Sequence, residues 1–415
     1  MTTNDHLTCR FCRAPLTHSF ADLGYTPLAN SYLSADMLGK PEPSYPLHAR
    51  VCGQCFLVQV ESVVPPEHIF GHYAYFSSYS TSWVEHARRF TENVIDRFAL
   101  DQQSHVVEIA SNDGYLLKHF VERHIPCLGI EPAANVAEVA IKAGVPTEVR
   151  FFGLETARDL VASGRSADLL AANNVLAHVP DLNDFVAGMA HILKPAGVLS
   201  VEFPHLLRLI NEVQFDTIYH EHYCYFSLLA IEKIFAAHGL AVFDVEELST
   251  HGGSLRIFAH RIDGEKRAIG SGLTKVQGDE KAAGLDHIAA YEGFASKVKT
   301  VCNGLIDFVC TQAKNGKAVV AYGAAAKGNT LLNVCKIGVN DIAYVVDKST
   351  AKQNHYLPGS HLPIYSPAKI FETKPDYVLI LPWNLADEIR GEMKDIRNWG
   401  GQFVTAIPAI KICNS

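Results

Sequence analysis

Two Cys-x-x-Cys pairs near the start of this 415-residue chain constrain its fold more than any other feature. Cys9 and Cys12 form the first pair, and Cys52 and Cys55 form the second. Each pair can present two thiolates on one tight turn, and two such turns complete a tetrahedral zinc site. The intervening segment is rich in glycine and proline, so it cannot form a long helix and benefits from a metal staple. Free buried cysteines would explain the doubled spacing poorly, and a redox dithiol needs only one pair, so we predict structural zinc.

Composition places the chain among ordinary globular proteins. Hydrophobic residues make up 48% and charged residues 19%, and the length suits two or three domains. A net charge of -8, without a run of lysine and arginine, argues against a nucleic-acid partner. The polar start and the lack of a membrane-length apolar stretch predict no membrane association and a cytoplasmic location.

A strand, a tight loop and a helix follow one another from Val106 onward, which is typical of a nucleotide or cofactor site. Glu108, Ala110, Asn112 and Gly114 fall at every second position there. The pattern resembles the first motif of the S-adenosylmethionine (SAM)-dependent methyltransferases, acidic-x-Gly-x-Gly-x-Gly, with Ala110 and Asn112 at two glycine positions. Small residues let the backbone approach the cofactor closely.

Two later strands add polar groups to the same predicted site. One strand ends at Glu131, where an α/β nucleotide site holds an acidic residue for ribose hydroxyls, although NAD enzymes share this geometry. Another ends at Asn173 and is followed by His178 and the turn Lys194-Pro-Ala-Gly197, which resembles the fourth strand and following turn of methyltransferases. The predicted cofactor-binding residues are Glu108, Ala110, Ser111, Asn112, Gly114, Glu131 and Asn173.

The stretch from Asp216 to Ser227 concentrates titratable and aromatic side chains, with Tyr219, His220, Glu221 and His222 in succession. Imidazole moves protons near neutral pH, a carboxylate can orient it, and a phenol can hydrogen-bond a developing oxyanion. Metal binding is the alternative, but adjacent His-Glu-His side chains diverge and lack the helical i, i+4 spacing. We therefore expect an active site here. An earlier cluster, Tyr73 to Ser80, predicts either core packing or a binding lid.

The C-terminal half contains a second strand–loop–helix unit, with Gly323, Ala325 and Gly328 at the Gly-x-Gly-x-x-Gly positions. A following strand ends at Asp347, so this unit alone suggests a dinucleotide site. A hairpin around Gly252 presents Arg256 either to a phosphate or to solvent. Residues 261–283 are charged and glycine-rich, which suits a mobile connection, and a long helix is expected from Tyr291 to Ala313.

Four sequence features together resemble those of the nucleotide-sugar C-methyltransferases. They are the two Cys-x-x-Cys pairs, Asp22-Leu-Gly-Tyr-Thr-Pro-Leu-Ala-Asn-Ser-Tyr32, Glu108-Ile-Ala-Ser-Asn-Asp-Gly114 and Tyr219-His-Glu-His-Tyr-Cys-Tyr-Phe-Ser227. The resemblance spans nearly the whole chain. It implies an α/β protein with an N-terminal zinc-binding module, a central SAM-methyltransferase Rossmann-like domain and a C-terminal Rossmann-like domain. The expected divisions are residues 1–75 for the zinc module, 76–262 for the SAM domain, 263–300 for a connecting segment and helix, and 301–415 for the C-terminal domain.

The resemblance also implies a reaction. A methyl group passes from SAM to a ring carbon, C3 in preference to C5, of a nucleotide-linked 4-keto-deoxysugar with thymidine diphosphate as the favoured carrier. Because carbon is nucleophilic only as an enolate, a base is required, and we assign His222. His220 is chemically equivalent, Tyr219 and Glu221 would orient the base or bind sugar, and His178 or Tyr73 would stabilise the enolate oxygen.

The resemblance implies that the C-terminal unit helps to hold the sugar nucleotide. The alternative is that this unit is a structural scaffold that binds no ligand. The expected substrate-binding residues are Arg256, Gly323, Lys327, Asn329, Asp347, Trp383 and Asn384. Two other functions remain open from sequence: an NAD-dependent nucleotide-sugar dehydrogenase that uses the C-terminal fingerprint, and a non-catalytic zinc-knuckle binding protein. A monomer is the favoured assembly.

Overall fold

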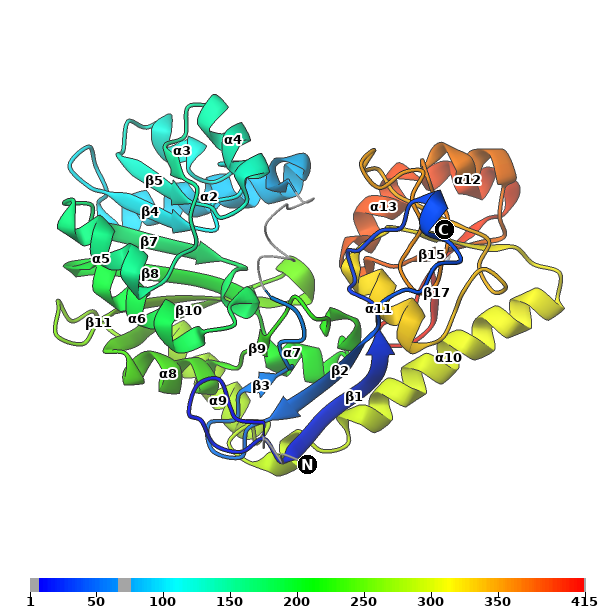
Figure 1. Ribbon diagram of the computed structural model, residues 1–415, viewed down its shortest axis with the longest axis horizontal. Helices are drawn as coiled ribbons and strands as arrows, with labels where there is room; N and C mark the ends of the chain where they lie inside the picture. Colours follow the sequence, from blue (N-terminus) through cyan, green and yellow to red (C-terminus); the bar gives the residue numbers. More distant parts are fainter. Residues whose placement is uncertain (1–6, 66–75, 414–415) are drawn as a thin grey trace.

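The computed structural model describes residues 7–65 and 76–413. The strands in these residues form three β-sheets (Figure 1). The three sheets follow one another along the chain, apart from one short strand of the first sheet. Apolar cores join the first sheet to the central and C-terminal units. The predicted arrangement of a cysteine module, a central Rossmann-like domain and a C-terminal Rossmann-like domain is confirmed. No helix in the described ranges has the length and apolar character needed to cross a membrane.

The N-terminal sheet is antiparallel, in the order β1-β2-β3-β9. Its strands are β1 (His18–Thr26), β2 (Tyr45–Val51), β3 (Val58–Gln59) and β9 (Cys224–Tyr225), with the short helix η1 (Ala35–Met37) between β1 and β2. Strand β9 comes from the stretch that we predicted to be the active site. It pairs Tyr225 with Val58 and Cys224 with Gln59, so the cysteine module and the active-site stretch share one sheet.

The central sheet has the order β10-β11-β8-β7-β4-β5-β6. Its strands are β4 (Val106–Ile109), β5 (Cys127–Ile130), β6 (Thr147–Glu148), β7 (Ala167–Asn173), β8 (Leu193–Pro204), β10 (Leu240–Leu248) and β11 (Ser254–Arg261). Strands β6, β5, β4, β7 and β8 run parallel, whereas β11 and β10 pair antiparallel. The order reverses between β4 and β7, and ligands bind at the carboxyl ends of strands at such a point.

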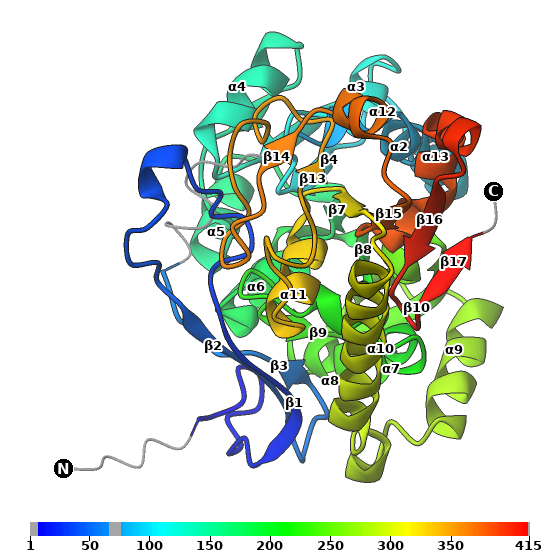
Figure 2. The same ribbon diagram turned by 90° about the vertical axis from the view of Figure 1, so that its right-hand side faces the viewer.

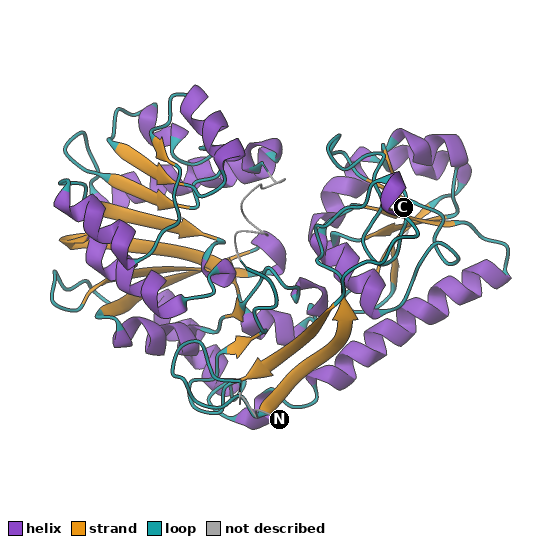
Figure 3. Ribbon diagram, in the orientation of Figure 1, coloured by secondary structure: helices purple, strands orange, loops and turns teal. Residues whose placement is uncertain are grey.

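Helices cover both faces of this sheet, as Figure 3 shows. The helices in this part of the chain are η2 (Ser77–Tyr79), α2 (Thr81–Phe98), α3 (Lys118–Val121), α4 (Ala134–Lys142), α5 (Leu154–Ala162), η3 (Leu176–His178), α6 (Leu182–Ile192), α7 (Leu206–Asn211), η4 (Phe215–Thr217), α8 (Leu228–Ala237) and η5 (Thr250–Gly252). Helix α2 is amphipathic and begins where the Ser80 hydroxyl accepts a hydrogen bond from the Trp83 backbone N–H. The apolar stripe of α2 packs toward the sheet because one side of a parallel sheet must be covered.

The connection to the C-terminal unit contains α9 (Ser271–Ala282), η6 (Ile288–Ala290) and α10 (Phe294–Lys314). The expectation of a mobile connection over residues 261–283 is wrong, because α9 is docked through the buried carboxylate of Glu280. That carboxylate accepts the backbone N–H groups of Leu228 and Leu229 at 2.6 and 2.8 Å, and His205 Nε2 lies 2.7 Å from it. The long helix expected from Tyr291 to Ala313 is α10.

The C-terminal sheet has the order β14-β13-β12-β15-β16-β17, with every pair parallel except β16 with β17. Its elements are β12 (Val319–Tyr322), α11 (Ala326–Val334), β13 (Val345–Val346), β14 (Ile364–Tyr365), α12 (Ala368–Thr373), β15 (Tyr377–Ile380), η7 (Trp383–Leu385), α13 (Ala386–Glu392), η8 (Lys394–Trp399), β16 (Gln402–Thr405) and β17 (Lys411–Cys413). Here the order reverses between β12 and β15, so their carboxyl ends define a second crevice.

The N-terminal sheet packs against the helices of the C-terminal unit. Figure 2 shows α10 and α11 side by side, with β1 next to them. Phe20 of β1 stacks on Phe294 of α10 with ring centroids 4.4 Å apart, and one apolar core includes residues of β1, β2, α7, α10 and α11. The C-terminal unit is therefore anchored to the active-site region by apolar burial.

Candidate active site

The four cysteine sulfurs gather at one point, as the spacing predicted. They lie within 4.8 Å of one another, with Cys9 and Cys55 sulfurs 3.5 Å apart and Cys12 and Cys52 sulfurs 3.4 Å apart. A zinc ion with Zn–S bonds of about 2.3 Å sets sulfurs roughly 3.8 Å apart in a tetrahedron. The side-chain N–H of Gln59 lies 3.3 Å from the Cys9 sulfur, a contact that suits a thiolate. The donor set therefore fits a tetrahedral metal with no position open for catalysis.

The two cysteine turns have the same local structure. In each turn the residue after the second cysteine, Arg13 or Phe56, has a left-handed backbone with φ of 64°. Its N–H donates to the carbonyl of the first cysteine, at 3.1 Å for Arg13 and 3.0 Å for Phe56. A left-handed residue costs a non-glycine side chain free energy, and the repetition of that conformation suits two turns that present their thiols to one metal ion.

The predicted cofactor loop lies at the carboxyl end of β4, at the switch point of the central sheet. Ala110 and Asn112, which stand where the resembled motif has glycine, adopt left-handed φ values of 54° and 50°, and Gly114 has φ of 78°. A side chain at Gly129 would lie 2.3 Å from the Ser111 hydroxyl, so β5 approaches this loop closely. The loop therefore keeps the backbone path of a glycine-rich loop with only one glycine.

Carboxylates and amides shape this loop. Both oxygens of Glu131 accept backbone N–H groups, from Asn112 at 2.9 Å and from Ala133 at 2.8 Å. The Asn112 side chain in turn accepts the Ser77 N–H at 2.9 Å, and Asp113 accepts both the N–H and the hydroxyl of Ser78. Helix η2 is therefore fastened over the loop, and Glu131 supports the loop as well as bordering the site.

Buried acceptors without protein partners surround the loop. Among the described residues, Glu108 Oε2, Ser111 Oγ and Asn173 Oδ1 are buried and have no hydrogen-bond partner. Burial raises the pKa of Glu108 well above its usual range. Buried polar atoms are nearly always paired in folded proteins, so these atoms are suited to hydrogen bonds with a ligand. The ammonium and hydroxyl groups of SAM would supply such partners, and an ammonium would favour the carboxylate form of Glu108.

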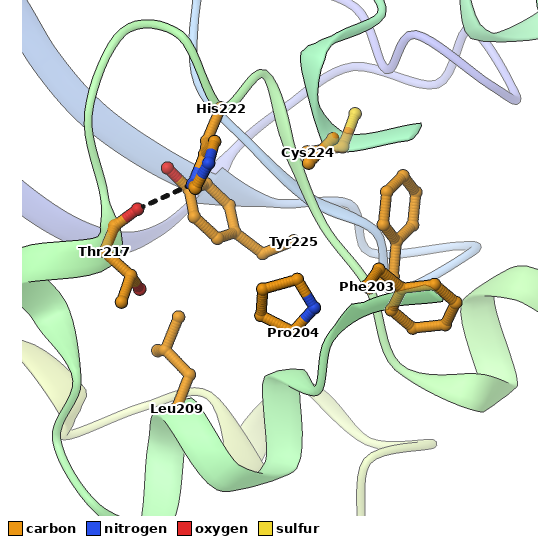
Figure 4. A pocket seen from close by; sticks show the side chains of 9 residues that line it. Phe203, Pro204, Leu209, Thr217, His222, Cys224 and Tyr225 are labelled. Carbon is orange, nitrogen blue, oxygen red and sulfur yellow. Dashed lines mark hydrogen bonds between the residues drawn. The ribbon is translucent and has the colours of Figure 1, made fainter. Parts of the chain in front are cut away.

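His222 and Tyr219 form a hydrogen-bonded pair in the Asp216–Ser227 stretch. His222 Nδ1 lies 2.9 Å from the Thr217 carbonyl (Figure 4), which only accepts, so Nδ1 carries the proton. Nε2 is then the acceptor nitrogen, and the Tyr219 hydroxyl donates to it at 2.8 Å. His222 also borders a narrow, mainly apolar cavity lined by Ala177, Phe203, Pro204, Leu209, Thr217, Cys224, Tyr225 and Phe226.

His178 reaches the same place from the end of β7. Its ring centroid lies 4.7 Å from that of His222, and its Nδ1 donates to the Glu221 carbonyl at 2.8 Å. Burial lowers the pKa of His178 to about 4 and, with the charge of His178 as a second cause, lowers the pKa of His222 well below its usual range. Both imidazoles are therefore neutral at pH 7 and able to accept a proton.

The other two members of the His-Glu-His run point elsewhere. The Glu221 carboxyl is buried, accepts the Asn30 amide N–H at 2.7 Å, and has its pKa raised to about 7 by burial. His220 Nε2 donates to the Pro46 carbonyl of β2 at 3.1 Å, and burial lowers the pKa of His220. His220 thus faces the N-terminal sheet, which leaves His222 as the better placed of the two candidate bases.

The C-terminal unit brings Lys327, Trp383 and Asn384 to this region. Lys327 Nζ donates to Asn384 Oδ1 at 3.2 Å and to the His251 carbonyl at 3.4 Å. The Trp383 indole N–H donates to Asp216 at 2.7 Å, which links η7 directly to the start of the active-site stretch. Lys327 also acts electrostatically on His222, so these groups share one site.

The remaining predicted substrate residues have structural partners. Asp347 accepts the Ala324 N–H at 2.8 Å, and Asn329 donates to the Ala29 carbonyl at 3.1 Å. A side chain at Gly323 would lie 2.4 Å from Pro382, so this glycine allows β12 and β15 to end close together. Arg256 is buried, and its guanidinium forms ion pairs with Glu202 and Glu246 at 2.9 and 3.0 Å. The guanidinium that was expected to face a phosphate or solvent is thus paired with these two carboxylates. Tyr73 lies outside the described residues.

Sequence reasoning missed several residues that the fold brings to the site. Asp216, His251 and Asn30 all contact predicted active-site groups, and none was assigned a role. Asp216 and Asn30 lie in stretches that the sequence analysis quoted, so their position inside those motifs was the available signal. His251 has a left-handed backbone with φ of 54°, and its neighbour Gly252 was the only hint of that conformation.

Three family descriptions match successive parts of the chain. "Putative zinc binding domain" matches residues 9–70, a methyltransferase domain matches 83–245, and a C-methyltransferase C-terminal domain matches 249–408. The matches follow the order of the three sheets. Together with the switch-point loop and the four-cysteine cluster, they define a methyltransferase with an N-terminal metal-binding domain.

The C-methyltransferase NovU of Streptomyces niveus is 33% identical to the chain over 407 residues, which are 98% of this chain and 97% of that protein. The chain therefore belongs to the C-methyltransferase family, and it is a SAM-dependent enzyme. Two solved structures are similar to about half of the chain. The PH0226 protein of Pyrococcus horikoshii OT3 has 12% identity and a TM-score of 0.37, and the match covers 47% of this chain and 97% of that chain. The magnesium protoporphyrin IX methyltransferase of Synechocystis PCC 6803 with bound SAM has 12% identity and a TM-score of 0.35, and the match covers 49% of this chain and 100% of that chain. The sequence prediction of a C-methyltransferase is confirmed.

Proposed function

We propose that this enzyme methylates a ring carbon, C3 in preference to C5, of a nucleotide-linked 4-keto-deoxysugar carried by thymidine diphosphate. Membership of the C-methyltransferase family supports a carbon acceptor, and the sequence resemblance supports the keto sugar. The methyl donor supplies an electrophilic carbon on a sulfonium, so the protein has to supply a nucleophilic carbon. Zinc at the four cysteines, a monomeric state and a cytoplasmic location complete the proposal.

The hydrogen bonding of His222 is the observation that carries the proposal. A carbon next to a ketone becomes nucleophilic only after it loses a proton, and that loss needs a neutral base inside a site shielded from water. The Thr217 carbonyl fixes the tautomer of His222 so that Nε2 is the proton-accepting nitrogen. An oxygen or nitrogen acceptor already carries the lone pair that attacks a methyl group, whereas the carbon beside a ketone has none until a base removes its proton.

The Tyr219 hydroxyl gives this base a natural partner. In the protein without substrate it donates to His222 Nε2. When the keto sugar binds, the hydroxyl can turn to the ketone oxygen, and Nε2 is then exposed to the C–H bond beside the ketone. Nε2 takes the proton, the C–H electron pair forms the enolate that the Tyr219 O–H stabilises, and the carbon attacks the methyl group. SAM bound at the β4 loop would supply the electrophilic methyl group, with a neutral thioether as the leaving group.

The hydrogen bond that fixes the tautomer of His178 changes the role that we assign to this residue. Because its Nδ1 donates to the Glu221 carbonyl, its Nε2 is an acceptor, which suits a base or a proton relay better than a donor to the enolate oxygen. Glu221 then holds His178 through its backbone and meets Asn30 through its side chain. Tyr73 remains a sequence prediction for the enolate oxygen.

The dehydrogenase alternative has no support in the C-terminal crevice. The Ala324 carbonyl accepts the Tyr32 hydroxyl at 2.7 Å and the Lys352 ammonium at 2.9 Å, and Pro382 packs against Gly323. These groups occupy the glycine-loop positions where a dinucleotide pyrophosphate would approach the backbone. Membership of the C-methyltransferase family likewise disfavours the non-catalytic alternative.

Methyl transfer to paired sugar nucleotides tests the proposal. The purified enzyme is incubated with methyl-labelled SAM and thymidine-, guanosine- or cytidine-linked 4-keto-deoxysugars, each beside its reduced 4-hydroxy counterpart. We expect label on carbon in the keto sugar only, and mass spectrometry with NMR identifies C3 or C5. Label on oxygen, or equal transfer to the 4-hydroxy sugar, would contradict an enolate mechanism.

A further inference from the structure

Lys327 places a cation of the C-terminal unit inside the methyltransferase site. It lies in the first turn of α11, and its ammonium reaches the His251 carbonyl of η5 in the central domain. Its other hydrogen-bond partner is the amide oxygen of Asn384, at 3.2 Å. Both partners are neutral oxygens, and both distances are long for a charge-assisted hydrogen bond.

No carboxylate pairs with this ammonium in the part of the chain that the structure describes. Asp216 is an electrostatic partner of Lys327, and the Trp383 indole contacts both residues: Lys327 Nζ is 4.9 Å from the ring centroid, and the indole N–H donates to Asp216 at 2.7 Å. Asp216 is fully buried, and its second oxygen has no hydrogen-bond partner among the described residues. The two charges attract without contact, so Lys327 keeps its positive charge available.

The backbone opposite Lys327 is strained. His251 has φ of 54° in the left-handed region, and Gly252 has φ of 89°. A side chain at Gly252 would lie 2.3 Å from Trp383, so the η5 turn is pressed against η7 and its carbonyl faces the ammonium. Strain of this kind persists where the surrounding structure requires it, and it clusters at ligand sites.

We propose that Lys327 forms an anionic-oxygen site in which the C-terminal unit neutralises a negative charge of the substrate during methyl transfer. This inference rests on the proposed function for the identity of the substrate, but the cation site itself does not. An unpaired, partly buried ammonium is costly in the free protein and becomes favourable when an anion binds. Burial also lowers the pKa of Lys327, whereas a bound anion would restore it.

Two oxygens of the proposed substrate share the required chemistry. One belongs to the diphosphate that joins sugar to nucleoside, and the other is the enolate oxygen that forms when His222 removes the proton. The ammonium contacts the His251 carbonyl and acts electrostatically on both His222 and His251, so an anionic oxygen bound to it would lie at the border of the methyltransferase site. The experiment below separates these two sources.

The test compares Lys327→Met, Lys327→Arg and the control Lys336→Met, which removes an exposed lysine just beyond the other end of the same helix. Calorimetry measures the affinity of each protein for thymidine diphosphate and for inorganic diphosphate. Exchange of the proton beside the ketone into heavy water, without SAM, measures enolate formation. Chemical denaturation measures stability, and S-adenosylhomocysteine binding reports on the cofactor site.

We expect Lys327→Met to weaken diphosphate binding or slow proton exchange by about ten- to a hundredfold, with Lys327→Arg intermediate and Lys336→Met unchanged. A loss of affinity for diphosphate would identify the diphosphate as the anion that Lys327 binds. A loss of proton exchange with unchanged diphosphate affinity would identify the enolate oxygen instead. The denaturation midpoint should stay the same or rise, because an unpaired charge is removed. Affinity and exchange both within twofold of wild type, or losses explained by a lower midpoint, would overturn the inference. If the wild type methylates no keto sugar, the diphosphate measurement still tests Lys327 on its own.

Discussion

Individual side chains in this site owe their protonation to burial and to a few backbone carbonyls. His178 and His222 are both neutral because burial disfavours the imidazolium form, and each has its tautomer fixed by a carbonyl acceptor. Glu221 shows the same effect with the opposite sign, since burial favours its neutral form and raises its pKa to about 7. A buried neutral imidazole can take up the proton as the enolate forms.

Glu221→Gln should make the protein more stable at alkaline pH. The folded-state pKa of Glu221 is about 7, compared with 4.5 as its ordinary value. Stability from the buried neutral carboxyl is therefore fully present below pH 4.5 and is lost as the pH rises through 7. Glutamine stays neutral and keeps an oxygen for Asn30, so we expect a gain of roughly 3 kcal/mol in unfolding free energy at pH 8 and none near pH 4. Denaturant titrations at both pH values check this, and an equal gain at both would refute the pKa assignment.

Single residues were also the hardest part to predict from sequence. The motif supplied His222, Tyr219, Glu221 and His220 together, but only their tertiary partners separate them. His220 meets a carbonyl of β2 and Arg256 meets two carboxylates, and neither partner is adjacent in the chain. The direction of a side chain depends on such distant groups, whereas the presence of a reactive stretch depends on local composition.

Secondary-structure elements carry the connection between the metal module and the base. Strand β3 pairs with β9, and the Val60 N–H donates to the Tyr223 carbonyl at 3.0 Å. Arg10, inside the first cysteine turn, lies over the Tyr223 ring and donates to the carbonyls of Pro180 and Val60 at 3.1 and 2.6 Å. Tyr223 in turn donates its N–H to Ala177, next to His178. The first cysteine turn therefore supports the segments that carry both histidines.

Arg10→Met should lower kcat by about ten- to a hundredfold with little change in KM, because a loosened histidine pair affects the reaction more than binding. Arg10→Lys should recover part of the loss, and the bound metal should be unchanged. Arg13→Met is the matched control, since Arg13 is an exposed arginine on the same turn. Steady-state kinetics and metal analysis decide the matter: equal losses in both variants, or a loss of metal with Arg10→Met, would mean that the turn itself had been damaged.

Elements were predictable where the signal was local. The cysteine turns, the β4 loop, α2 and α10 follow from spacing and apolar periodicity. Strand β9 and helix α9 do not, because β9 is two residues long and α9 has a polar sequence with few buried positions. Their stability comes from pairing with β3 and from the buried contacts of Glu280, which sequence periodicity does not report.

The molecule as a whole assembles one site from three sheets. The cofactor loop and His178 follow strands of the central sheet, and His222 directly precedes β9 of the N-terminal sheet, whose module also provides Asn30. The C-terminal unit provides Lys327 and Trp383. The order of these units was readable from the chain because each begins with its own motif. Their mutual contacts were not, because they join residues that are far apart in sequence.

Exchange of the proton beside the ketone tests the central claim most directly. A 4-keto-deoxysugar nucleotide is incubated in heavy water with wild-type enzyme and with His222→Asn, in the presence of S-adenosylhomocysteine, and deuterium uptake is followed by mass spectrometry. We predict rapid uptake with the wild type and a loss of at least about a hundredfold with His222→Asn, while cofactor binding stays normal. Uptake at the wild-type rate in His222→Asn would contradict the account.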